Sequence, residues 1–176
     1  MSKANQLDAC LDSAKKLRIV SRHLRHQRKE PLMDSILYAD GSYSYLALRF
    51  GLAVTFFAHS TQQVFGWWGG RGFKGMIKNW NEKYHIPVAI CVIGMFTELL
   101  SVPAMIFGFL VRPAALGLAI FMAVAIKKAH WQNGFFLAQG PGKGTGIEFC
   151  LALFLMAVTL LIGGAGALSI DGVLTR

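Results

Sequence analysis

Four long apolar segments alternate along this chain with polar or glycine-rich connections. They run over residues 44–67, 87–111, 113–129 and 147–170. A helix needs about 20 apolar residues to cross the ~30 Å hydrocarbon layer of a bilayer. The third segment is short, because its uncharged part ends at Ile126, and it crosses only if Lys127 and Lys128 extend to the surface or face the protein interior. The pattern predicts an all-α fold, an integral membrane bundle of four helices.

The first 43 residues follow a different pattern. Apolar residues recur there at near-helical spacing among lysines and arginines: Leu7, Leu11, Ala14 and Leu17. This spacing predicts a basic amphipathic helix on the membrane surface, and a solvated helix that docks on a partner subunit fits equally. We therefore divide the chain into an N-terminal arm (residues 1–43) and a four-span membrane domain (residues 44–176).

Composition supports the membrane interpretation, since 54% of the residues are hydrophobic and only 15% are charged. The formal charge of +9 comes from basic residues in the arm and at the ends of the apolar segments. That placement suits anionic lipid head groups better than nucleic acid. No secretory signal is visible in the polar arm. Counts of lysine and arginine alone do not decide the topology, but a long charged arm is hard to translocate, which favours a cytoplasmic N-terminus.

Glu98 is the only acidic or basic side chain between Ile86 and Val111. A carboxylate at the centre of a bilayer costs about 2.5–3.5 kcal/mol, so such a group usually faces a bundle interior, a partner or a water-filled cavity. Two readings stay open. Glu98 exchanges protons with a ligand, or it is a structural carboxyl group bonded to His59, Gln62 or Arg49.

Helical spacing also predicts which faces of the segments point inward. In the second segment this face carries Cys91, Gly94, Glu98, Ser101, Met105 and Gly108. The same reasoning selects Thr55, His59, Gln62 and Gly66 in the first segment. In the fourth segment it selects Glu148, Ala152, Thr159, Gly163 and Gly166. The small residues among them indicate helix packing.

Two aromatic loops fall on the same side of the predicted bundle, residues 66–73 and residues 130–136. With Glu98 beneath them, they would form an aromatic pocket with a cation above and a carboxyl group below. Such a pocket suits a flat, weakly polar ring such as a quinone, and a carboxyl group inside it could exchange protons with that ring. We predict Glu98 and His59 as catalytic residues. The predicted quinone-binding residues are Trp67, Trp68, Arg71, Phe73, Asn133, Phe135, Phe136 and Glu148.

Other cofactors have no motif in this sequence. Residues 140–146 are rich in glycine, but Lys143 is followed by Gly144 instead of the serine or threonine of a P-loop. The spacing of histidine and cysteine matches no zinc, haem or iron–sulfur pattern, and no flavin motif is present. We therefore do not expect a metal site, or a complete electron-transfer enzyme in this chain alone.

One set of residues recurs together along the membrane part of the chain: Arg49, the 66–73 loop, Glu98, Arg112, the 133–136 loop, Glu148 and the closing Ser169-Ile170-Asp171. In these residues, and over roughly residues 46–172, the chain resembles the DoxX family of bacterial membrane proteins. The resemblance implies a four-span protein of the bacterial inner membrane. Some relatives are small subunits of thiosulfate:quinone oxidoreductases, and others associate with redox or oxidative-stress enzymes.

Three functions follow from these observations. The first is an integral membrane subunit of a redox complex, which shapes a quinone-type site and assists electron and proton transfer while partner subunits carry the remaining redox chemistry. The second is a non-catalytic structural or assembly subunit, docked on a larger membrane complex by residues 1–43. The third is a small transporter or lipid-handling protein.

Overall fold

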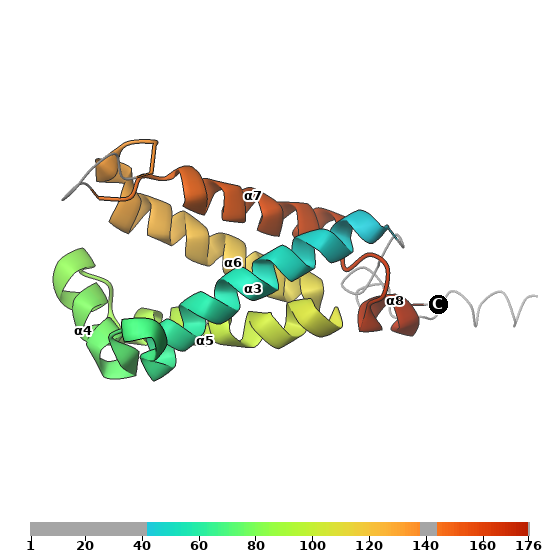
Figure 1. The fold of residues 1–176 in the computed structure, drawn as a ribbon, viewed down its shortest axis with the longest axis horizontal. Helices are drawn as coiled ribbons and strands as arrows, with labels where there is room; N and C mark the ends of the chain where they lie inside the picture. Colours follow the sequence, from blue (N-terminus) through green and yellow to red (C-terminus); the bar gives the residue numbers. More distant parts are fainter. Residues whose placement is uncertain (1–41, 138–143, 176) are drawn as a thin grey trace, which may run out of the picture. The chain divides into compact units, whose positions relative to one another are not determined.

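The computed structural model describes residues 42–137 and 144–175, and within these residues the chain is helical and contains no strand. The predicted arm lies almost entirely outside the described residues. The long helices are α3 (Tyr43–Phe65), α5 (Val88–Phe107), α6 (Val111–Ala125) and α7 (Glu148–Gly163), and the shorter ones are α4 (Gly72–Tyr84) and α8 (Ile170–Leu174) (Figure 1). The predicted all-α class is therefore confirmed.

The third apolar segment forms a longer helix than its uncharged part suggests. α6 continues without a break into a π-helical turn, Ile126–His130, so the helical chain runs from Val111 to His130. Twenty residues of helix span about 30 Å. Lys127 and Lys128 lie in the final turn and are exposed, as the prediction required.

The four long helices form a closed ring in which α3 and α6 each contact both α5 and α7. Successive helices run in opposite directions (Figure 1). Small residues allow the close approach of α6 and α7, where Ala115, Ala119 and Ala157 are buried. The core also contains Leu52, Phe56, Met105, Leu118, Leu153 and Leu160.

The outer surface of the ring is also apolar. Large exposed hydrophobic side chains occur on every long helix, among them Phe50, Val54, Ile93, Leu100, Leu116, Ile120, Leu155 and Ile162. A monomer in water rarely exposes this much apolar surface, whereas a helix surface that contacts lipid is usually apolar. Among the described residues, α5 is the one helix both long and apolar enough to cross a membrane, and α7 is apolar but shorter.

The structure corrects the predicted inward faces of α3 and α7. α3 buries Leu52, Phe56 and Gln63, so its inward face is rotated by one residue from the predicted line through Thr55 and Gln62. α7 buries Cys150, Leu153, Ala157 and Leu160, and its Glu148 is exposed. The prediction for α5 was better, because Cys91, Glu98, Ser101 and Met105 are buried as expected.

A buried charge cluster ties the C-terminal segment to the ring. Asp171, 1% exposed, accepts hydrogen bonds from the backbone N–H groups of Leu110 (2.8 Å) and Val111 (3.0 Å) at the start of α6. Arg49 on α3 is fully buried and donates from Nη2 to the carbonyl groups of Ala167 and Leu168. This cluster gives structural roles to Arg49 and Asp171, two of the residues that carry the family resemblance.

Candidate functional site

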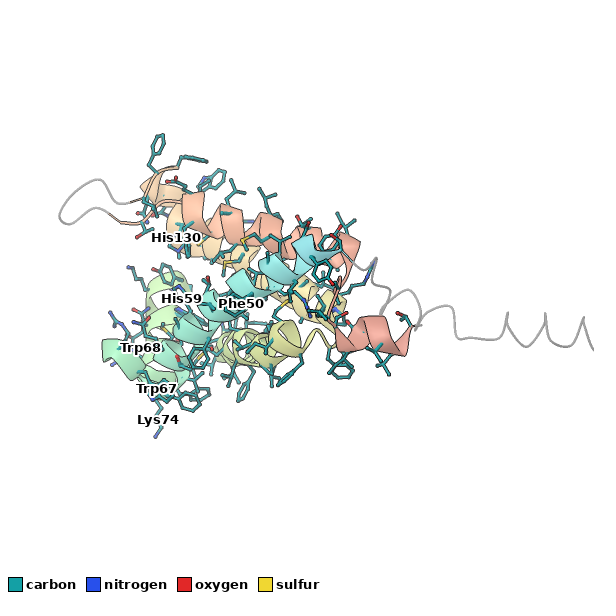
Figure 2. All side chains as sticks on the ribbon, turned by 45° about the vertical axis from the view of Figure 1, so that its right-hand side comes forward. Phe50, His59, Trp67, Trp68, Lys74 and His130 are labelled. Atoms are coloured by element: carbon teal, nitrogen blue, oxygen red, sulfur yellow. The ribbon has the colours of Figure 1, made fainter. Side chains whose placement is uncertain are left out.

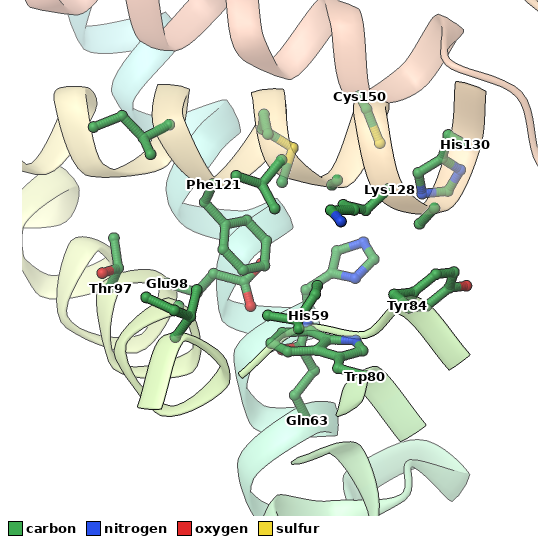
Figure 3. Close-up of a pocket in the computed structure, with 18 of the residues that line it drawn as sticks. His59, Gln63, Trp80, Tyr84, Thr97, Glu98, Phe121, Lys128, His130 and Cys150 are labelled. Atoms are coloured by element: carbon green, nitrogen blue, oxygen red, sulfur yellow. The ribbon is translucent and has the colours of Figure 1, made fainter. Parts of the chain in front are cut away.

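A cavity of about 660 Å³ opens among α3, α4, α5, α6 and α7. Its walls are mainly apolar and aromatic, and include Phe56, Trp80, Phe121 and Phe149. Its polar lining comes from a small set of side chains, which includes His59, Gln63, Glu98, Lys128 and His130. Figure 3 shows these polar groups on different helices around one space. An apolar cavity with a few convergent polar groups is the usual form of a small-molecule site.

Glu98 forms the inner polar end of the cavity. It lies in the middle of α5, is 1% exposed, and its Oε2 atom has no hydrogen-bond partner. Its side-chain hydrogen-bond partner is Gln63, one position from the Gln62 considered from sequence. Gln63 also has an unpartnered buried oxygen, Oε1. A buried polar atom without a partner costs about 1–3 kcal/mol, so both atoms are available to a ligand or to water.

His59 lies on α3 one turn before Gln63, and its ring faces the same cavity. The ring centroid is 6.4 Å from that of Phe149 on α7. No described residue forms a hydrogen bond with the imidazole. The structure thus brings the two predicted catalytic residues, Glu98 and His59, to one cavity.

Helix α4 supplies a wall of the cavity that the sequence analysis missed. We predicted a loop at residues 66–73 and did not place Trp80 at the site, but Gly72–Tyr84 is a helix. Met76, Trp80 and Tyr84 recur every four residues and all line the cavity. The Trp80 ring lies 5.8 Å from that of Phe121 on α6. This four-residue repeat of large side chains was the signal that could have identified α4.

The loop end of the cavity carries Lys128 and His130, on the π-helical turn that ends α6. His130 Nδ1 lies 2.7 Å from the carbonyl oxygen of Thr145. A carbonyl oxygen only accepts, so Nδ1 carries a hydrogen and Nε2 is left to take up a proton. Cys150 on α7 also lines the cavity, and it is a free thiol.

The tryptophan loop lies outside this cavity. Trp67 and Trp68 are 51% and 63% exposed, and their rings pack against each other and against Phe57. Figure 2 shows both at the turn between α3 and α4. Arg71 is exposed, and Phe73 packs edge-on against Phe96. The structure does not bring these four residues to Glu98, and their role in binding stays a prediction.

The second loop is held together by hydrogen bonds between its side chains and its own backbone. Glu148 Oε2 accepts from the backbone N–H of Leu137 (3.1 Å), and Asn133 donates from Nδ2 to the Thr145 carbonyl group (3.0 Å). Phe135 and Phe136 pack edge-on against each other and are 49% and 62% exposed. Asn133 and Glu148 therefore shape the loop in this structure, and none of the four lines the cavity. Quinone contact by these residues stays a prediction.

The fold and cavity define an all-α protein with an apolar outer surface and a buried carboxyl group inside a ring of helices. The family model that matches this chain is DoxX, over residues 44–131, half of the 176 residues. The chain belongs to the DoxX family, which confirms the resemblance and makes it a membrane-associated protein.

A Haemophilus influenzae protein described only as "Uncharacterized protein" is 27% identical over 139 residues, which cover 76% of this chain and 84% of the relative. No solved structure matches the chain significantly. Within the described residues, no group of three or more His, Cys, Asp or Glu side chains could hold a metal ion.

Proposed function

We propose that this chain is an integral membrane subunit of a redox complex, which binds a quinone-type ring in the cavity and exchanges protons through Glu98. One observation carries the proposal: a buried carboxyl group with an unpartnered oxygen at the inner end of an aromatic-walled cavity. Burying a carboxyl group within a membrane costs free energy, so the residues that carry one there usually serve a function. His59 lies beside it in the same cavity and is the second proton-exchanging group.

The residues present fit a flat, weakly polar ring. Trp80 and Phe121 offer aromatic surface, and the Glu98 and Gln63 oxygens and the His59 ring offer hydrogen-bonding groups. A bound quinone supplies two-electron chemistry that takes up or releases protons. The chain itself contributes a water-poor space, a carboxyl group that holds a proton, and an imidazole that passes one. Electrons come from partner subunits, because this sequence carries no flavin, haem or metal motif.

The proposed setting is a bacterial inner membrane with four crossings, α3, α5, α6 and α7, and a cytoplasmic N-terminus. Support comes from the apolar outer surface of all four helices and from their alternating directions. Residues 1–43 would then contact the membrane surface or dock on partner subunits at the cytoplasmic side.

Quinone binding can be measured on the purified chain in lipid nanodiscs by quenching of tryptophan fluorescence with a short-chain quinone. Of the four tryptophans, Trp80 is the one that lines the cavity. We expect saturable quenching that Trp80→Phe removes. Glu98→Gln should weaken binding about tenfold, or ~1.4 kcal/mol, because it replaces an acceptor oxygen with a donor.

Glu82→Gln is the matched control, since that exposed carboxyl group pairs only with Lys78, lies outside the cavity and should leave quinone affinity unchanged. In the reconstituted complex, Glu98→Gln should abolish quinone turnover while the complex still assembles. Quenching that is the same in wild type, Trp80→Phe and Glu98→Gln would refute the proposal. That result would favour the structural or assembly subunit.

A further inference from the structure

Titratable side chains follow one another along the cavity from the middle of α5 to the loop between α6 and α7. We infer that they form a proton path, from Glu98 through His59 to His130 at the loop end of the cavity. The proposed quinone chemistry supplies the use of the proton, and in that respect the inference rests on the proposed function. Proton movement along the path can be measured without a quinone.

Glu98 needs such a path because it has almost no access to bulk water. Its side chain is 1% exposed, and it lies ten residues after the start of α5, or about 15 Å along the helix. Its unpartnered Oε2 atom is the point at which a proton can enter or leave. The other side chain at this end, Gln63, hydrogen-bonds to the carboxyl group but does not titrate.

His59 lines the cavity between Glu98 and His130, and its side chain is partly exposed there. Figure 3 shows its ring between the Glu98 carboxyl group on one side and Tyr84 and His130 on the other. Because no described residue hydrogen-bonds to this ring, both nitrogens stay open to the cavity. An imidazole can take a proton on one nitrogen and release it from the other, which is the property a relay needs.

His130 has the geometry of the outer proton acceptor. Its Nδ1 is fixed to the Thr145 carbonyl oxygen at 2.7 Å, which leaves Nε2 to gain and lose a proton. The residue is only partly buried and lies in the last helical turn before the loop. A cavity of about 660 Å³ has room for the water molecules that would link its polar groups.

The remaining titratable groups that line the cavity do not compete for this role. Lys128 lies at the loop end, but its exposed ammonium group only donates hydrogen bonds. The phenol of Tyr84 and the thiol of Cys150 belong to chemical classes that release a proton less readily than a carboxyl group or an imidazolium. The carboxyl group of Glu98 and the imidazoles of His59 and His130 are thus the lining groups that belong to the chemical classes best suited to proton exchange near neutral pH.

The test follows hydrogen–deuterium exchange of the Glu98 carboxyl group in nanodiscs by infrared spectroscopy after transfer to D₂O, without quinone. The Glu98 band is the protonated-carboxyl C=O stretch that Glu98→Gln removes. We expect His59→Gln and His130→Asn to slow its deuteration at least tenfold. Asn can still donate to the Thr145 carbonyl oxygen but cannot titrate, and added imidazole should restore the rate in His130→Asn. His85→Gln is the control, because His85 is exposed and does not line the cavity.

Two results would overturn the path. One is deuteration at the wild-type rate in both His59→Gln and His130→Asn, and the other is the absence at every pH of a carboxyl band that Glu98→Gln removes. Failure of quinone to bind would leave these exchange rates unchanged, so the two proposals can fail separately. Far-UV circular dichroism confirms that each variant keeps its helical content.

Discussion

The buried carboxyl group of Asp171 offers the clearest test of how this fold is held together. Its two oxygens accept from consecutive backbone N–H groups, those of Leu110 and Val111, at the start of α6. Arg49, fully buried on α3, is its electrostatic partner. One side chain therefore links the C-terminal helix α8 to two helices of the ring. The replacement Asp171→Asn keeps the shape of the side chain but removes its charge.

The size of the effect follows from these contacts. The Asn amide nitrogen would face a backbone N–H, so one hydrogen bond to a charged group is lost, which is worth about 1.5–3 kcal/mol. Arg49 would also lose a favourable electrostatic interaction with the Asp171 charge, which acts without a direct ion pair between the two side chains. The two terms overlap, and the Ala167 and Leu168 carbonyl groups still accept from Arg49. We therefore expect the free energy of unfolding to fall by about 3 kcal/mol.

The assay is denaturant unfolding in detergent micelles, followed by far-UV circular dichroism. Glu82→Gln is the control, because Glu82 forms only an exposed 3.9 Å ion pair with Lys78 and should change stability by less than about 0.5 kcal/mol. The double variant Arg49→Gln/Asp171→Asn should lose less than the sum of the two single changes. The reasoning would be refuted if Asp171→Asn were as stable as Glu82→Gln. It would also be refuted if the stability losses of Arg49→Gln and Asp171→Asn were strictly additive in the double variant.

Two further predictions concern a helix end and a loop. Gly108→Ala should destabilise the protein by more than about 1 kcal/mol in the same assay, because its φ is +65° and an added Cβ would collide with the Arg49 guanidinium group and with Ser169; a neutral result would contradict the close packing there. Glu148→Ala should speed amide exchange at Leu137 about fivefold, the equivalent of one lost hydrogen bond, and Glu148→Gln should do so less. Equal exchange in all three proteins would show that this carboxyl group does not hold the loop.

The sequence predicted those residues of the candidate site that are polar side chains within apolar segments. Glu98 is a single acid in a long apolar segment, and the cost of placing it in lipid requires an interior position whatever the neighbours are. His59 was found for a related reason, as a polar side chain near the end of an apolar helix. Both line the cavity.

The predicted binding loops show where that reasoning stops. Aromatic residues beside glycines indicated a ligand pocket, yet the structure places Trp67 and Trp68 in an exposed cluster and Asn133 and Glu148 in hydrogen bonds within their own loop. Sequence places both loops at the same end of the bundle. It does not state which way each side chain points, because that depends on turn geometry and on contacts with residues far away in the chain.

The sequence by itself determined the helical class, the apolar character of the four long helices, the DoxX resemblance and the interior position of Glu98. These properties depend on hydropathy and spacing, which are local quantities that add along a segment. Tertiary structure alone decided that Gln63 is the partner of Glu98, that α4 closes the cavity, and that α7 turns Cys150 inward. A helix that is apolar on all sides, such as α7, has no preferred face of its own, so only the shapes of its neighbours fix its rotation.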